Sequence, residues 1–224
     1  MFDLSHFIDA IPLTYAALFP VLNPIGTAFI FLALTHRLSS ASRRRLAFRI
    51  ALNSFILLTI VLWVGEWVLG FFGVSIAVVQ VAGGLVLVSI GWKIMSSDGG
   101  GGEGYGKEIT TDADASAQAF FPLTLPLTAG PGSMAVALTV GAHENLGSVP
   151  QIMMGKVGVM VGILLAAITV YFCYGYAHYL TKKLGTSGTQ VIIKLSAFII
   201  FCIGLTILFR GLQDVLAQWS FIAS

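Results

Sequence analysis

Two prolines, an asparagine and a glycine interrupt the first long apolar segment of the chain, which runs from about residue 11 to residue 34. Pro20 and Pro24 lack an amide hydrogen and clash with the carbonyl four residues back, while Asn23 and Gly26 tolerate turn geometry. A helix should therefore break near its centre here. Polar backbone groups freed in lipid cost on the order of several kcal/mol each unless protein or water satisfies them. Such groups can bind a ligand, which makes the break a candidate site.

The same pattern returns in the segment from about residue 118 to residue 140, between Pro126 and Gly132. A shift of 106 residues places Pro20 on Pro126 and Gly26 on Gly132. A single proline in a membrane helix is typical of a simple kink. Two interrupted segments at matching places in two halves of a chain instead indicate the binding site of a transporter.

The composition is that of an integral membrane protein, with 57% hydrophobic residues, 10% charged residues and a mean hydropathy of +0.91. A helix needs about 20 apolar residues to cross a bilayer. Six apolar segments reach that length, at about residues 11–34, 46–69, 75–95, 118–141, 152–180 and 191–212. The sequence therefore predicts an all-α polytopic membrane protein with six transmembrane helices.

A glycine-rich stretch at about residues 96–117 divides the chain into two halves. It carries no G-x-x-x-x-G-K-[ST] pattern, so we interpret it as a flexible cytoplasmic linker within a single transmembrane domain, and not as a nucleotide-binding loop. Repeat 1 then covers about residues 1–95, and repeat 2 covers about residues 118–224. Because each repeat has three spans, the second must start from the opposite face of the membrane. We expect a 3+3 inverted repeat in which spans 1 and 4 are discontinuous.

The basic residues are distributed unevenly between the loops. Of the 12 lysines and arginines, ten fall on the side of the loop that carries Arg43, Arg44 and Arg45, and only Lys156 and Arg210 fall on the other side. Cytoplasmic loops carry such an excess, so the arginine run is interpreted as a topology determinant. We expect both termini outside, in a multi-pass protein of a bacterial-type plasma (inner) membrane.

The two breaks are expected to form one site near the membrane midplane. Helices that restart near Pro24 and Pro131 direct positive N-terminal ends towards it, which favours an anionic group such as a carboxylate. Unwound carbonyls favour a cation, and an amino acid offers both groups. The predicted substrate-binding residues are Leu22, Asn23, Pro24, Ile25, Gly26, Thr128, Ala129, Gly130, Pro131 and Gly132.

Ionisable residues are scarce inside the predicted spans. Glu66 is the candidate for proton coupling, with capping at the membrane interface as the alternative, and Asn53 is a candidate for an ion site built with backbone carbonyls. A dianionic or cationic ligand is disfavoured because no counter-charge is expected at the breaks. The glycines at the breaks leave little room for a bulky ligand. A small neutral zwitterion fits these exclusions.

The sequence lacks the residue patterns that other functional classes require. The chain has no GxSxG or HExxH motif and no paired carboxylates inside a span, so an enzyme is not expected. Cys173 and Cys202 lie in apolar runs without CxxC spacing, which is typical of packing residues. We expect no metal, no cofactor and no nucleic-acid partner. Gly83, Gly84 and Gly91 are interpreted as a close helix contact and not as a ligand surface.

Several stretches also resemble the signatures of a known family. The NPIG…FLxLT signature of the MarC family of integral membrane proteins resembles two stretches of this chain, from Asn23 to Gly26 and from Phe31 to Thr35. The stretch from Phe121 to Gly132 is similar to its PLxxPLxxGPG pattern, and the stretch from Val81 to Gly84 resembles its AGG pattern. The resemblance implies a six-span, transporter-like fold. It also implies that some members carry small neutral amino acids such as glycine and alanine.

The sequence thus predicts a secondary transporter for glycine, alanine, serine and similar small neutral amino acids, working by alternating access. A channel or an efflux protein for another small solute is the main alternative, because polar backbone at a break can also form a filter. A membrane partner that transports nothing is the third. The expected partners are a small neutral amino acid and the lipid bilayer, and an oligomer is compatible with this plan.

Overall fold

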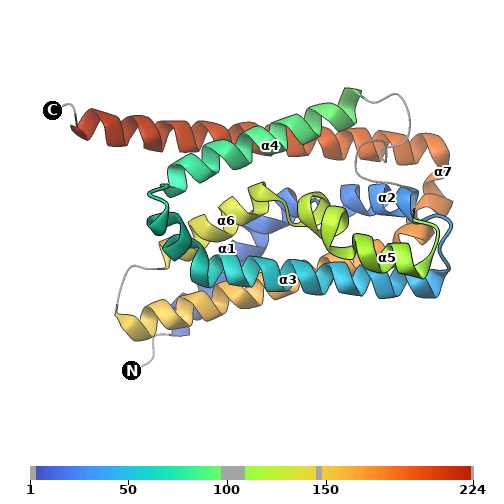
Figure 1. Ribbon diagram of the computed structural model, residues 1–224, viewed down its shortest axis with the longest axis horizontal. Helices are drawn as coiled ribbons and strands as arrows, with labels where there is room; N and C mark the ends of the chain where they lie inside the picture. Colours follow the sequence, from blue (N-terminus) through green and yellow to red (C-terminus); the bar gives the residue numbers. More distant parts are fainter. Residues whose placement is uncertain (1–3, 97–108, 145–147, 223–224) are drawn as a thin grey trace.

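The computed structural model describes residues 4–96, 109–144 and 148–222, which form eight helices and no β-strand (Figure 1). The elements are α1 (Leu4–Leu22), α2 (Pro24–Leu34), α3 (Ser40–Phe71), α4 (Ile76–Ser96), α5 (Asp112–Gln118), the irregular segment η1 (Ala119–Thr128), α6 (Pro131–His143) and α7 (Val149–Ile222). Helix α7 contains two long stretches, here named its first arm (Val149–Tyr179) and its second arm (Gln190–Ala217). The chain reverses direction between these arms (Figure 1).

The helices are arranged around a central group. Helix α4 and the second arm of α7 lie side by side on one side of the molecule, and α3 and the first arm lie on the other (Figure 1). Helices α1, α2 and α6 and segment η1 run between them. Fully buried side chains such as Leu18, Phe31 and Leu123 belong to one continuous apolar core. Both termini lie at the same end of the molecule (Figure 1).

Four helical stretches are long and apolar enough to cross a membrane, namely α3, α4 and the two arms of α7. They confirm four of the six predicted apolar segments. Two further candidates are bent pairs: α1 with α2, bent by 41°, and the α5–η1 segment with α6, bent by 66°. The number of spans is therefore six if each bent pair is one span.

Helix α3 presents a lipid-compatible face. Phe48, Leu52, Ile56 and Ile60 recur at every fourth position and are exposed on the outside of the bundle. Residues four apart share one face of a helix, so these side chains form a continuous apolar stripe. A stripe of this kind is favourable against lipid tails and unfavourable against water.

Glycines bring α4 and the second arm of α7 into close contact. A Cβ atom at Gly84 would lie 2.6 Å from the backbone nitrogen of Leu208, and one at Gly91 would lie 2.8 Å from the carbonyl oxygen of Ala197. Real Cβ atoms do not approach backbone atoms so closely, so only glycine fits at these two positions. The predicted close helix contact is confirmed for both.

The last part of the predicted linker is helical. Thr111 and Asp114 form a capping box at the start of α5, in which each side chain accepts a hydrogen bond from the backbone N–H of the other. Ile109, just before this box, is fully buried, and its N–H donates to the carbonyl of Leu34 at 2.9 Å. The stretch from 109 onward is thus anchored to the bundle, while the predicted linker residues 97–108 lie outside the described residues.

One arginine of the basic run has a structural role that the sequence did not indicate. Arg43 is buried, whereas Arg44 and Arg45 are exposed. Its Nη2 donates to the carbonyls of Thr35 and Leu38, each at 3.1 Å. These carbonyls lie where α2 ends, beyond the reach of helical partners. Arg43 therefore holds the corner between α2 and α3.

Replacing Arg43 by alanine should lower the stability of the folded protein in detergent. The change removes two hydrogen bonds from a charged donor to backbone carbonyls, each worth about 1.5–3 kcal/mol. We expect a loss of at least about 2 kcal/mol, measured as a lower midpoint of thermal unfolding. Arg44→Ala, at an exposed position of the same run, should shift the midpoint far less. Equal midpoints for the two variants would contradict the role of Arg43.

Candidate functional site

The first chain break lies at Asn23, between α1 and α2. Asn23 has φ 44° and ψ 56°, a left-handed conformation that asparagine tolerates better than most residues. Its Oδ1 accepts a hydrogen bond from the N–H of Gly26 at 3.3 Å, which caps the start of α2. Its Nδ2 donates to the carbonyl of Ser196, on the second arm of α7, at 3.3 Å. The break is thus fixed both locally and to α7.

Threonine hydroxyls satisfy carbonyls at this break. Thr27 is buried, and its Oγ1 lies 2.9 Å from the carbonyl oxygen of Asn23 and 3.4 Å from that of Leu22. The carbonyl of Asn23 also accepts from the N–H of Thr27 at 3.0 Å, whereas the N–H of Gly26, the usual partner of the Leu22 carbonyl, donates to Asn23 Oδ1 instead. A buried carbonyl without a partner is costly. Thr27 therefore stabilises the bend between α1 and α2.

The second break is the segment η1. Phe121 and Leu125 have extended backbone angles within it, because each precedes a proline and is pushed away from the helical region. Two buried hydroxyls again satisfy the backbone: Thr124 and Thr128 each donate to the carbonyl five residues back, at 2.7 and 2.8 Å. Both breaks are therefore stabilised in the same chemical way.

Helix α6 restarts at Pro131, with Gly130 as its N-cap residue and no side chain capping its first turn. A Cβ atom at Gly130 would lie 2.8 Å from the carbonyl oxygen of Pro126, so the chain can turn this tightly only with glycine. The irregular backbone begins at Phe121, upstream of the predicted cluster from Pro126 to Gly132. The predicted restart near Pro131 agrees with the observed start of α6.

Tyr174, on the first arm of α7, joins the two breaks. It is fully buried, and its hydroxyl and that of Thr128 are hydrogen-bonded at 2.7 Å. Its ring stacks on Phe31 of α2, with the ring centroids 4.6 Å apart. One side chain therefore contacts both the second break and the helix that follows the first.

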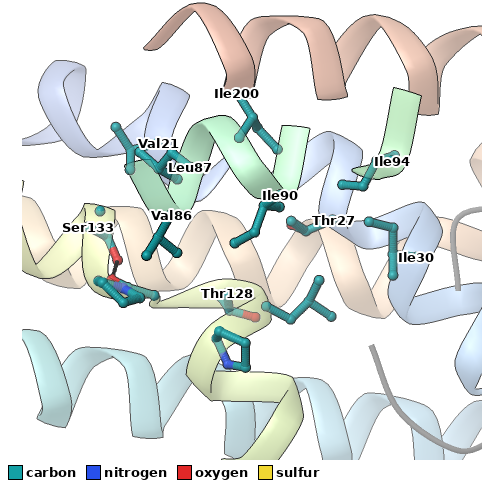
Figure 2. A pocket seen from close by; sticks show the side chains of 15 residues that line it. Val21, Thr27, Ile30, Val86, Leu87, Ile90, Ile94, Thr128, Ser133 and Ile200 are labelled. Carbon is teal, nitrogen blue, oxygen red and sulfur yellow. Dashed lines mark hydrogen bonds between the residues drawn. The ribbon is translucent and has the colours of Figure 1, made fainter. Parts of the chain in front are cut away.

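A small pocket, here named the break pocket, lies beside this network (Figure 2). Its volume is about 20 Å³, enough for about one water molecule. In Figure 2, Thr27, Ile90 and Thr128 surround the same space, from α2, α4 and η1 respectively. Of the ten predicted substrate-binding residues, four line the break pocket, namely Thr128, Gly130, Pro131 and Gly132.

The predicted residues of the first break do not line this pocket. Asn23 and Gly26 instead lie against Ser196 of α7, whose Cβ would collide with a Cβ atom at position 26. The structure therefore brings the second break and Thr27 to the pocket, and turns the first break towards the second arm of α7. The other predicted residues that do not line the pocket are Leu22, Pro24, Ile25 and Ala129.

A second, larger cavity of about 420 Å³ lies between α1, α4, α6 and the second arm of α7, and is here named the wide cavity. Its lining residues include Leu13 and Val21 of α1, Gln80 of α4, Thr139 of α6 and Ile203 of α7. A buried cluster of Val21, Leu87 and Ile200, here named the divider, packs against Val136, Ile203 and Ile207, which line the wide cavity. All three residues line the break pocket, and Val21 also lines the wide cavity.

The candidate coupling residues are Glu66 and Asn53, both on α3. Neither of them lines the break pocket or the wide cavity. Both roles stay predictions. Across the described residues, no three or more His, Cys, Asp or Glu side chains are grouped so as to hold a metal ion.

Comparison with known proteins places the chain in a family. The sequence profile of MarC family integral membrane proteins matches residues 8–216. The chain belongs to this family. The UPF0056 inner membrane protein MarC of Salmonella typhimurium is 26% identical over 224 residues, covering 98% of this chain and 100% of the relative. The protein of the same name from Escherichia coli (strain SMS-3-5) has the same identity and coverage. No solved structure matches the chain.

Membership of the MarC family confirms the resemblance that the sequence motifs indicated. The motifs did not reveal Thr27, Tyr174 or Ser196, although all three contact the breaks. Thr27 directly follows the NPIG stretch, so its place one turn into a restarted helix was a usable signal. Tyr174 and Ser196 lie more than 40 residues from the nearest break in sequence, and only the packing of α7 brings them there.

The contact between Gly26 and Ser196 predicts a reciprocal pair of variants. Gly26→Ala should destabilise the protein, because the new methyl group would collide with the side chain of Ser196 and with Nδ2 of Asn23. Overpacking of this kind costs about 1–3 kcal/mol. Adding Ser196→Gly removes the first of these collisions and should restore part of the thermal midpoint, and Ser196→Gly alone should be milder than Gly26→Ala. Additive losses in the double variant would show that the two residues are not in contact.

Proposed function

We propose that this MarC family protein is a secondary transporter for small neutral amino acids such as glycine, alanine and serine. The observation that carries the proposal is that Tyr174 joins the second break to helix α2, through its hydrogen bond to Thr128 and its ring stacking on Phe31. Each bent pair is taken as one discontinuous span, which gives six spans in a 3+3 inverted repeat. The substrate binds between the breaks, and the protein moves it by alternating access across the inner membrane named in its relatives.

The chemistry of the break pocket supports this ligand class. The uncapped first turn of α6 offers backbone N–H groups to a carboxylate. Polar atoms beside the pocket come from Thr27, Thr128 and Ser133, and its other side chains are aliphatic or proline. No ionised side chain lines it, so a ligand with net charge would lack a partner. A small zwitterion is the ligand that these groups suit.

The size of the pocket favours a carrier over a pore. About 20 Å³ is too small for an amino acid. Substrate entry therefore requires a rearrangement, as in a carrier. Saturable counterflow at modest turnover is expected from the purified protein in vesicles, whereas single-channel currents would support the channel alternative.

Substrate choice is tested by competition in reconstituted vesicles. Glycine, alanine and serine should each reduce the uptake of labelled glycine, while glutamate and lysine should not, because the site has no counter-charge for them. Tight binding of glutamate or lysine, with none of glycine or alanine, would overturn the proposed substrate class.

A variant at the break tests the site itself. A side chain at Gly132 would collide with Leu87 of the divider, so Gly132→Val should abolish glycine uptake while folded protein persists. Gly70→Val is the matched control, because a Cβ atom there meets nothing within 4 Å. Normal uptake by a well-folded Gly132→Val variant would contradict the site.

The inverted repeat predicts a topology with both termini outside. Tags at residue 1 and residue 224 should react with an impermeant reagent in whole cells, and a tag in the 96–117 stretch should react only after lysis. The two termini at one end of the molecule support this arrangement (Figure 1). A C-terminal tag found in the cytoplasm would remove the inverted repeat, since an odd number of spans would then be needed.

A further inference from the structure

A shallow groove lies where the first part of α3 runs beside α5, at the end of the bundle opposite to both termini (Figure 1). We name it the arginine groove, and its lining includes Ser42, Arg45, Leu46 and Arg49 of α3 and Asp112 and Ser116 of α5. Its volume is about 40 Å³. The two arginines, the aspartate and Ser116 are all exposed, so a ligand that lies across the groove can reach them from outside.

The two helices that form the groove run in the same direction. Helix α5 begins beside the corner between α2 and α3, where the N–H of Ile109 is hydrogen-bonded to the end of α2. Further along, Arg49 Nη1 donates to Ser116 Oγ, which places these two residues at one level. Arg45 lies one turn before Arg49, and Asp112 lies one turn before Ser116. Arg45 and Asp112 therefore share the next level, nearer the corner.

The charged groups of the groove are not neutralised by one another. Among the described residues, the side chains of Arg45 and Asp112 have no hydrogen-bond or ion-pair partner. Arg49 uses one of its five N–H groups on Ser116. Two guanidinium groups and one carboxylate are thus available to a ligand. Guanidinium groups are well suited to a phosphate, because their N–H groups match its oxygens in pairs.

Apolar side chains continue both walls of the groove, away from the corner. Arg49, Leu52 and Ile56 are three and four residues apart, so they lie on one face of α3, and both aliphatic side chains are exposed. On the other wall, Phe120 follows Ser116 by four residues, and its ring is exposed as well. Each wall therefore changes from polar to apolar in the same direction, as expected where a membrane protein passes from the headgroups into the lipid tails.

The order of these groups along the groove selects the ligand. The apolar side chains come first, then Arg49, and then Arg45 with Asp112 at the level nearest the corner. A phospholipid that ends in an amine has the same order: acyl chains, phosphate, ammonium. A phospholipid without the amine would bring its phosphate close to the carboxylate of Asp112 with no cation between them, which is unfavourable.

We propose that the arginine groove binds a phospholipid whose phosphate is followed by a primary ammonium group, such as phosphatidylethanolamine. The phosphate lies between Arg45 and Arg49, and the ammonium group binds Asp112. An acyl chain lies against Leu52 and Ile56. This inference goes beyond the transport proposal and does not depend on it, since lipid binding needs only the folded protein.

The proposal is tested by titrating the purified full-length protein in detergent with phosphatidylethanolamine that carries a fluorophore at the end of an acyl chain. Arg45→Gln should weaken binding about tenfold, because it removes a charged hydrogen bond to the phosphate. Its thermal midpoint should not change, since Arg45 has no partner among the described residues. Arg44→Gln is the matched control, because Arg44 is exposed in the same run and does not line the groove. Equal lipid affinities of the two variants would overturn the site.

Asp112→Asn separates this site from a general basic surface. The change should weaken the binding of phosphatidylethanolamine about tenfold, because it removes the partner of the ammonium group. It should strengthen the binding of phosphatidylglycerol with the same label, because it removes a repulsive charge. The capping box of Thr111 and Asp114 is untouched, so α5 should persist. A gain for both lipids, or no change for either, would overturn the contact with the ammonium group.

A soluble competitor separates a lipid from a free phosphate compound. Glycerophosphoethanolamine carries the same headgroup without acyl chains, so it cannot use the apolar part of the groove. It should displace the labelled lipid only at far higher concentrations than unlabelled phosphatidylethanolamine does. Equal displacement by the two compounds would assign the groove to a soluble ligand and overturn the lipid site.

Discussion

The need to satisfy every backbone carbonyl away from water governs the centre of this protein. Each break removes helical hydrogen bonds where an apolar environment offers no replacement. Threonine hydroxyls provide hydrogen bonds at both breaks. At the first break, the hydroxyl of Thr27 donates to a carbonyl four residues back. At the second break, those of Thr124 and Thr128 donate to carbonyls five residues back. Because a hydroxyl can also accept, Thr128 still pairs with Tyr174. Hydroxyl groups of the protein itself therefore pair with carbonyls at both breaks.

Glycine contacts divide the bundle into mechanical units. The backbones of α4 and the second arm of α7 touch at Gly84 and Gly91, so neither helix can shift far without the other. This pair meets the central group through side chains, as where Leu87 of the divider lies against Gly132, and also through backbone, since a Cβ atom at Gly83 would lie 3.2 Å from the carbonyl oxygen of Pro131.

Sequence reasoning found what local chemistry determines. Proline and glycine spacing located the bends between α1 and α2 and before α6, and hydropathy located α3, α4 and both arms of α7. Sequence reasoning did not predict which part of the bundle each break faces. Asn23 and Gly26 turn towards Ser196, a contact that depends on how the second arm of α7 packs.

The two spaces differ in how much must change before a ligand occupies them. The wide cavity already has about 420 Å³, and Val21 of the divider lines both it and the break pocket. The divider is held by van der Waals contacts among aliphatic side chains, each of which is weak. Enlarging the break pocket itself, by contrast, would disturb the hydrogen bond between Tyr174 and Thr128, both buried. In the proposed mechanism the divider therefore opens first, and the network at the breaks responds only once a ligand supplies replacement hydrogen bonds.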